Sequence, residues 1–260
     1  MSKSFQIAGA TLDALSAGLV FERLVLWRGS VIKRPRTICF VNAFSIVTAA
    51  KDPEFLKAIN SSDLAVLDGA PLAWMGRLMT GMPCDRLSGP DFMHALLTRP
   101  EYSGLRHFVL GGSQAALDRL EFKYNRGGTA SPRKVVGTWS PPFRELTPEE
   151  ERGFVDRMAE LRPDVLWVCL GTARQEKWMA RMREILDVPV MAGVGAAVDF
   201  LSGNKPRAPR WMQSAGLEWL FRLVSEPRRL WRRYLVGNVR FLRLALMELW
   251  RHRAARRQRA

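Results

Sequence analysis

Polar side chains that could do chemistry follow two short apolar segments of the chain. Asn42 ends the run TICFVN, and Asp68 follows the run LAVL. A carboxylate at a strand end, partly removed from water, is well placed to take a proton from a hydroxyl group near neutral pH. The amide of Asn42 can hydrogen-bond a hydroxyl from a neighbouring strand end. Both interpretations have a simpler alternative, because Asp-Gly pairs and Asn residues often only form turns.

A glycine-rich turn is a second candidate site. Gly111, Gly112 and Ser113 end the run RHFVL and precede a predicted helix. Backbone N–H groups at such a turn can cradle a phosphate or a nucleotide. The pattern is short of a complete Gly-x-Gly-x-x-Gly or Walker motif, so the indication is weak on its own.

The elements that would position these residues alternate along the middle of the chain. The predicted strands are 37–42, 64–67, 106–110, 134–138, 164–170 and 188–194. Predicted helices include 53–60, with Asp52 as N-cap, and one that Thr147 begins with a capping box. Repeated strand–turn–helix units predict an α/β fold, a Rossmann-like parallel sheet flanked by helices. Such sheets bind ligands at the carboxyl ends of their strands, where the candidate residues fall.

Charge is concentrated at the C-terminal end of the chain. The 260 residues carry a net charge of +15, and residues 205–260 hold fifteen basic and three acidic residues, an excess of +12. This excess predicts a polyanionic partner for that end, such as a membrane surface, a phosphorylated lipid or a nucleic acid. We expect two regions: an α/β domain over 1–203 and an Arg-rich helical appendage over 204–260.

The appendage has amphipathic character. On a helical wheel, one arc of about 100° is basic, and an apolar side faces away from it. The basic arc holds Arg229, Arg232, Arg233, Arg240 and Arg243, and the apolar side holds Leu230, Trp231, Tyr234, Leu235, Phe241 and Leu242. This pattern fits a helix lying in a membrane interface, and it also fits an ordinary helix packed on its own protein. Gly237–Asn238 leaves a break in the helix open.

The cysteines and acidic residues limit which metal sites the chain could form. Cys39, Cys84 and Cys169 are odd in number and form no Cys/His cluster, which predicts free thiols in a reducing cytoplasm and no zinc site. Neither a signal peptide nor an apolar stretch of about 18 residues is recognisable, so we expect no membrane-spanning helix. An Asp-x-Asp pair, a common site for a divalent ion, does not occur.

Several segments together resemble the WecG/TagA/CpsF family of bacterial glycosyltransferases. They occur in the family's order over roughly residues 37–240, and the longest are PDVLWVCLGTARQEKWM and RAPRWMQSAGLEWLFRLVSEPRRLWRRY. The resemblance implies an inverting transferase that moves a sugar from a UDP-sugar to a polyprenyl-diphosphate-linked saccharide. It implies work in exopolysaccharide or other cell-envelope polysaccharide synthesis, on the inner face of the cell membrane. It leaves a homo-oligomer open.

The resemblance assigns roles to individual residues. Asp68 matches the family's catalytic base, with Asn42 and Gln175 beside it as further catalytic residues. Phe40 departs from the family, whose members often have Thr there. The expected substrate-binding residues are Gly111, Gly112, Ser113, Gly171, Thr172, Glu176, Gly195, Asp199, Arg222, Arg229, Arg232 and Arg233. Among these, Glu176 could equally complement a helix dipole and Asp199 could equally cap a helix.

Helix N-termini and arginines, instead of a metal ion, are then expected to offset the diphosphate charge, and no cofactor is expected. Two other classes of protein fit part of the sequence. A basic nucleic-acid-binding α/β protein fits the charge, but no RNA- or DNA-binding motif is recognisable, so we expect no nucleic-acid partner. A nicotinamide-dependent dehydrogenase fits only the fold and lacks the dinucleotide fingerprint.

Overall fold

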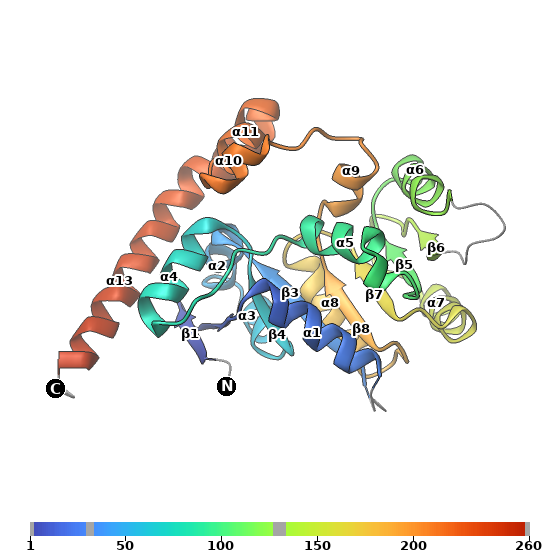
Figure 1. Cartoon of the computed structure of the whole chain (residues 1–260), viewed down its shortest axis with the longest axis horizontal. Coiled ribbons are helices and arrows are strands. Elements are labelled where there is room, and N and C mark those ends of the chain that lie inside the picture. Colours follow the sequence, from blue (N-terminus) through green and yellow to red (C-terminus); the bar gives the residue numbers. More distant parts are fainter. Residues whose placement is uncertain (1–2, 30–33, 127–133, 258–260) are drawn as a thin grey trace. The chain divides into compact units, whose positions relative to one another are not determined.

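A computed structural model describes residues 3–29, 34–126 and 134–257 of the chain. Its main element is a six-stranded parallel sheet with helices around it, so the predicted Rossmann-like α/β class is confirmed (Figure 1). In sheet order the strands are β4 (Leu64–Leu67), β3 (Arg36–Val41), β8 (Val190–Gly193), β7 (Val165–Val168), β5 (His107–Leu110) and β6 (Val135–Trp139). All six lie close to the strands expected from the sequence.

The chain forms two compact units. Unit 1 contains Met1–Val20, Phe40–Leu87 and Arg207–Ala260, and unit 2 contains Phe21–Cys39 and Ser88–Pro206. The division between the units therefore passes through β3. The basic C-terminal segment belongs to the same unit as the strand end that carries Asp68. The expected division of the chain at residue 203 into a catalytic domain and an appendage stays a prediction.

Unit 1 begins with an antiparallel hairpin that the sequence did not lead us to expect. Its strands are β1 (Lys3–Ile7) and β2 (Ala10–Ala14), and Ala8 and Gly9 both have positive φ, at 50° and 84°. Two positive φ values are typical of the tight turns that match strand twist. The helices of this unit are α2 (Ala43–Ala49), α3 (Pro53–Asn60), α4 (Ala70–Thr80), α10 (Arg210–Ser214), α11 (Glu218–Ser225), α12 (Pro227–Trp231) and α13 (Gly237–Arg257).

Unit 2 has its core around a fully buried aromatic side chain, Trp167 on β7. Its ring meets Phe92 edge-on, with centroids 5.9 Å apart, and its indole N–H donates to Nδ1 of His107 at 3.2 Å. Burial lowers the pKa of His107 to about 3, so this histidine is a neutral core residue. The helices of this unit are α5 (Gly89–Thr98), α6 (Gln114–Tyr124), α7 (Pro148–Leu161), α8 (Arg174–Met182) and α9 (Ala197–Leu201), and α1 (Ala17–Arg28) crosses its boundary.

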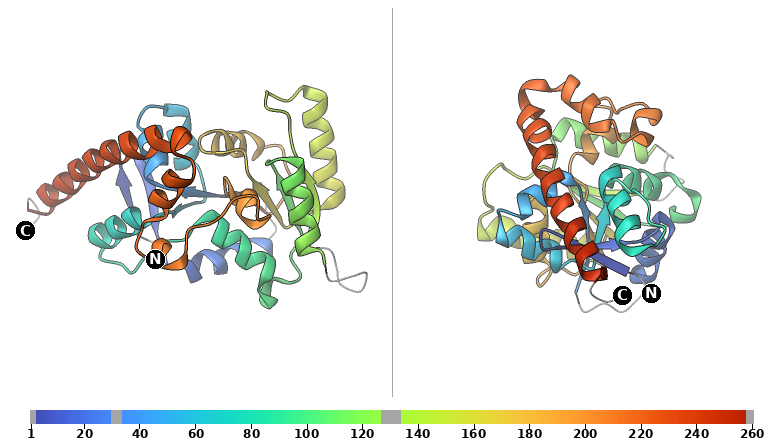
Figure 2. Two further views of the ribbon diagram at one scale, coloured as in Figure 1. Left: turned by 90° about the horizontal axis from the view of Figure 1, so that it is seen from above. Right: turned by 90° about the vertical axis from the view of Figure 1, so that its left-hand side faces the viewer.

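The C-terminal helix of unit 1 is continuous. Gly237–Asn238 does not break it, because α12 passes through a π-helical turn, Arg232–Val236, directly into α13 (Figure 2). The N–H group of Gly237 bonds to the carbonyl oxygen of Arg232, five residues earlier, and so closes the wide turn. None of the helices in the described part of the chain is long and apolar enough to span a membrane.

Candidate functional site

Asp68 lies at the tip of β4 in unit 1. Its N–H group donates to the carbonyl oxygen of Val41 at 2.8 Å, which joins the end of β4 to the end of β3. Gly69 then takes φ +122°, a conformation that favours glycine, and α4 begins at Ala70. The Asp68 side chain is partly exposed, so it is not sealed in the interior. The carboxylate therefore lies at the carboxyl end of a strand, as the sequence predicts.

Asn42 caps the helix that follows β3. Its Oδ1 accepts from the N–H of Ser45 at 3.1 Å and from the Ser45 hydroxyl at 3.3 Å, and the Ser45 hydroxyl accepts from the N–H of Asn42. This reciprocal pair is a capping box, so the simpler structural role of Asn42 is shown. Within the described residues its Nδ2 forms no hydrogen bond, which leaves a donor for a ligand.

Arg233 lies in the π-turn and interacts electrostatically with Asp68. Its guanidinium carbon lies 4.0 Å from the centre of the Phe44 ring, within cation–π range. Burial lowers the pKa of Arg233, and among the neighbouring charges Tyr234 and Asp68 raise it while Arg222 and Arg229 lower it. Within the described chain, its Nε is buried and has no hydrogen-bond partner. The four charged side chains therefore form one cluster in unit 1: Asp68, Arg222, Arg229 and Arg233.

Arg229 of this cluster and the neighbouring Arg232 are both largely exposed. The Arg229 Nε donates to Glu226 at 2.5 Å, and more than half of the Arg229 side chain remains exposed. Arg232 is exposed and stacks on the ring of Trp231, with its guanidinium carbon 5.1 Å from the ring centre. Asp68 raises the pKa of Arg233, the neighbour of Arg232 in the π-turn.

The segment that carries the arginines is attached to unit 1 by an ion pair that the sequence did not reveal. Arg86 donates to the Glu218 carboxylate at 2.6 Å and to the carbonyl oxygen of Gln213 at 2.9 Å, with both charged side chains about four-fifths buried. Gly216 approaches the start of α4 closely, because a Cβ built on it would lie 3.1 Å from that of Ala70. These contacts hold α10 and α11 beside the residues that follow Asp68.

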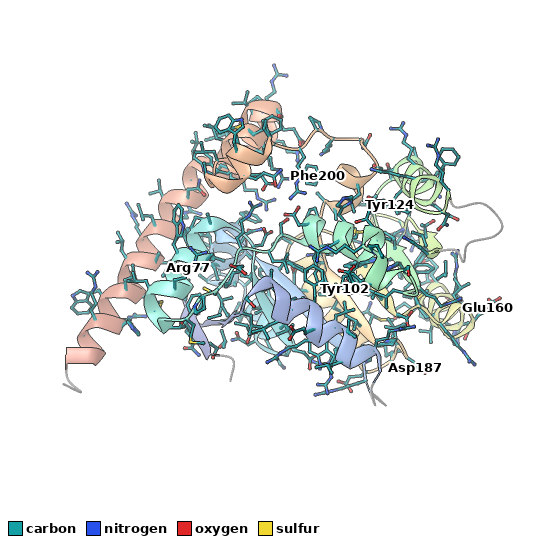
Figure 3. The ribbon with its side chains drawn as sticks, viewed as in Figure 1. Arg77, Tyr102, Tyr124, Glu160, Asp187 and Phe200 are labelled. Carbon is teal, nitrogen blue, oxygen red and sulfur yellow. The ribbon has the colours of Figure 1, made fainter. Side chains whose placement is uncertain are left out.

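Arg77, labelled in Figure 3, lies on α4 and fixes the loop that follows this helix. Its Nε donates to the carbonyl oxygen of Cys84 at 2.9 Å. Cys84 is buried and free, and burial raises its pKa. The loop before Arg86 is thus held by α4 of the same unit.

The predicted glycine-rich turn of unit 2 follows β5. Gly111 and Gly112 have φ values of +101° and +95°, and a Cβ on Gly111 would lie 2.6 Å from the carbonyl oxygen of Cys169. Glycine is therefore required at position 111 for both its conformation and this close approach. The hydroxyl of Ser113 accepts from the N–H of Ala116 at 3.3 Å and so caps α6.

A second turn of unit 2, after β7, contains the predicted residues Gly171 and Thr172. Gly171 has φ +86°, and Ala173 has φ +72°, which is rare for a residue with a side chain. Gln175 and Glu176 follow at the start of α8, and each is only 3% exposed. Burial raises the pKa of Glu176 to about 7, although the hydrogen bonds that its carboxylate accepts lower this pKa.

The turn after β8 carries the last two predicted residues. Gly195 has φ +58° and donates its N–H to Oε1 of Gln175 at 3.0 Å. Asp199, in the first turn of α9, accepts from Nδ2 of Asn204 at 3.1 Å and lies 3.8 Å from the ammonium of Lys205. In the described part of the chain, no group of three or more His, Cys, Asp or Glu residues could hold a metal ion.

Phe40 occupies a position where the family that the sequence resembles often has Thr. It is buried in β3 with 4% of its surface exposed. Its side chain therefore belongs to the protein interior, and the hydroxyl of the usual Thr has no counterpart at this position.

Comparison with known families identifies the family of this chain. The sequence model of the glycosyl transferase WecG/TagA/CpsF family matches residues 5–255, nearly the whole chain. The chain belongs to this family. It is accordingly a glycosyltransferase of cell-envelope polysaccharide synthesis, a class that uses a sugar nucleotide and a lipid-linked acceptor.

Proposed function

We propose that this chain transfers a sugar, with inversion, from a UDP-sugar to a saccharide carried on a polyprenyl diphosphate. The observation that carries this proposal is the charged cluster in unit 1. A partly exposed carboxylate, Asp68, ends a strand and interacts with Arg233, which in turn lies near Arg222 and Arg229. A base beside several guanidinium groups suits a reaction that removes a proton and releases a diphosphate.

In the proposed reaction, Asp68 accepts the proton of the acceptor hydroxyl while that oxygen attacks the anomeric carbon of the donor. The bond between the anomeric carbon and the phosphate oxygen breaks, and UDP leaves with the bonding electrons. The charge of the departing diphosphate is offset by Arg222, Arg229 and Arg233. A guanidinium group can donate two parallel hydrogen bonds to phosphate oxygens. The proposal includes no metal ion, so transfer should persist in EDTA.

Unit 2 is proposed to bind the nucleotide of the donor. The turns after β5 and β7 contain glycines with positive φ, a backbone type whose successive N–H groups can surround an anion. Gly195 and Asp199 are proposed to contact the uridine or the ribose. Support for this comes from their place at the ends of parallel strands, where α/β folds bind nucleotides.

The C-terminal helix is proposed to lie on the inner, anionic face of the cell membrane. Its buried residues, Leu230, Tyr234, Gly237, Phe241 and Ala245, pack within unit 1. A second apolar row remains exposed, consisting of Trp231, Leu235, Val239, Leu242, Leu246 and Trp250. The predicted apolar side of the helix thus divides into an inner row and an outer row. Exposed Trp and Leu residues beside arginines are typical of interfacial helices.

Asp68→Asn tests the proposed base. The substitution keeps the size of the side chain and removes its basicity, so transfer should fall about 100-fold or more, while UDP binding stays nearly unchanged. Product should be read by mass spectrometry with a panel of UDP-sugars and a short-chain polyprenyl-diphosphate saccharide. Asp187→Asn, in an exposed loop, is the matched control and should retain full activity. Unchanged transfer by Asp68→Asn would remove Asp68 from the mechanism.

A further inference from the structure

A chain of buried hydrogen bonds in unit 2 joins the turn after β7 to the turn after β8. Glu176 accepts from the N–H of Ala173 at 2.8 Å through Oε2, and from Nε2 of Gln175 at 2.9 Å through Oε1. The same Nε2 donates to the carbonyl oxygen of Gly193 at 2.9 Å, and Oε1 of Gln175 accepts from the N–H of Gly195 at 3.0 Å. The two side chains thus connect the ends of adjacent strands.

The turn after β7 needs such support. Ala173 has φ +72° and ψ −45°, a backbone conformation that persists only where the surrounding structure enforces it. The bond from its N–H to the Glu176 carboxylate is one restraint, and the bond from the N–H of Lys177 to its carbonyl oxygen at 3.2 Å is another. The described part of the chain offers no hydrogen-bond partner to the N–H groups of Gly171 and Thr172 in this turn.

The side chains that form the chain of hydrogen bonds have little capacity left for a substrate. Both amide hydrogens and the carbonyl oxygen of Gln175 are used, and both oxygens of Glu176 accept. Each side chain is 3% exposed. The raised pKa of Glu176 reflects the cost of this burial, which hydrogen bonding offsets in part. These features favour an indirect role over contact with the reacting atoms.

We infer that Glu176, together with Gln175, is a positioning residue that holds the turns after β7 and β8 so that the backbone N–H groups of Gly171 and Thr172 receive the diphosphate of the donor nucleotide. This inference rests on the proposed function, because it names the ligand of the same site. Gln175 then affects the reaction only by positioning the two turns. Asp68 has a different role, because it accepts the proton of the acceptor hydroxyl.

Glu176→Gln is the decisive variant. A carboxylate offers two acceptor oxygens, whereas an amide offers one oxygen and one NH₂ group, so either orientation leaves a donor facing Ala173 or Gln175 unpaired. A Glu176 that served only to fill space would tolerate this isosteric change. We expect amide hydrogen exchange at Ala173 and Gly195 to accelerate about 10-fold or more and the Kd for UDP to rise about 10-fold. At saturating donor, kcat should change much less than KM.

A second substitution should restore binding. Ala173→Gly removes the conformational penalty of the positive φ, so the turn needs less enforcement. Adding it to Glu176→Gln should recover most of the affinity for UDP. A Glu176 that merely stabilised α8 would show no such rescue. Glu150→Gln is the matched control, because Glu150 occupies the same capping-box position on α7 but is not linked to a second strand turn.

The outcomes separate this inference from the proposed function. Wild-type affinity for UDP and wild-type exchange in Glu176→Gln would overturn the positioning role. Faster exchange at Ala173 and Gly195 with unchanged affinity for UDP would also overturn it, because the turns would then be held without receiving the nucleotide. Absence of UDP binding by the wild-type chain would overturn the proposed function itself. The hydrogen-exchange measurement tests only the two turns and does not bear on that function. If Glu176→Gln does not fold, Ala173→Gly alone must leave UDP affinity at or above the wild-type level, and weaker binding would contradict the inference.

Discussion

At the scale of single residues, Glu176 links the stability of the fold to pH. Burial raises its pKa from 4.5 to about 7, so between these values the folded chain keeps a proton that the unfolded chain releases. Stability must therefore fall as pH rises through this window, by at most roughly 1.4 kcal/mol per pH unit. Urea unfolding should show the wild type losing roughly 2–3 kcal/mol relative to Glu176→Gln between pH 5 and 7. Parallel pH curves for the two proteins would show that Glu176 does not titrate there.

The residues of the candidate site were predictable where local sequence determines their surroundings. Asp68 and Asn42 follow apolar runs, and the structure places each directly after a strand. Phe44 and Arg86 escaped prediction because their roles depend on partners distant in sequence, Arg233 and Glu218. Nothing in a single sequence indicates which distant side chain a ring or a guanidinium group will meet.

At the scale of elements, the ion pair between Arg86 and Glu218 should determine how firmly α11 is held in unit 1. The pair is largely buried, so removing one partner leaves a charge uncompensated and should destabilise unit 1 by roughly 3 kcal/mol. Arg86→Ala and Glu218→Ala, measured separately and together by urea unfolding, should show a coupling energy above about 1 kcal/mol. The exposed pair Arg152–Glu149 is the control and should show almost none. Additive effects for the first pair would mean that α11 is held by other contacts.

Element boundaries were predictable where capping chemistry sets them. Helix α3 begins at Pro53 with Asp52 as its cap, and α7 begins after Thr147 with a capping box, both as the sequence predicts. Helix α8 has no such signal at its C-terminus: it ends at Met182, and the next turn is closed by a bond from the N–H of Ile185 to the carbonyl oxygen of Met182. The hairpin β1–β2 was missed, because an alanine at positive φ in its turn gives no sequence signal.

At the scale of the whole molecule, the net charge of +15 and the outer apolar row of the C-terminal helix lead to one prediction about membranes. Replacing Leu242, Leu246 and Trp250 by Gln removes exposed apolar surface and leaves the buried row intact, so the fold should be retained. Each such side chain contributes roughly 1.5–3 kcal/mol when buried, and nearby basic residues add about 1 kcal/mol each on anionic lipid. Flotation with vesicles of phosphatidylglycerol should therefore weaken about 100-fold or more.

The control for this experiment is Leu19→Gln with Leu26→Gln, which changes two exposed leucines on α1 and should leave flotation unchanged. Raising the salt concentration should weaken binding of the wild type, because the arginines contribute through screened charge. A filter-binding assay with RNA tests the alternative partner that the same charge suggests, a nucleic acid. Tight, salt-sensitive RNA binding together with no affinity for anionic vesicles would contradict the membrane proposal, because the outer row of Trp and Leu residues would then have no apolar phase to enter.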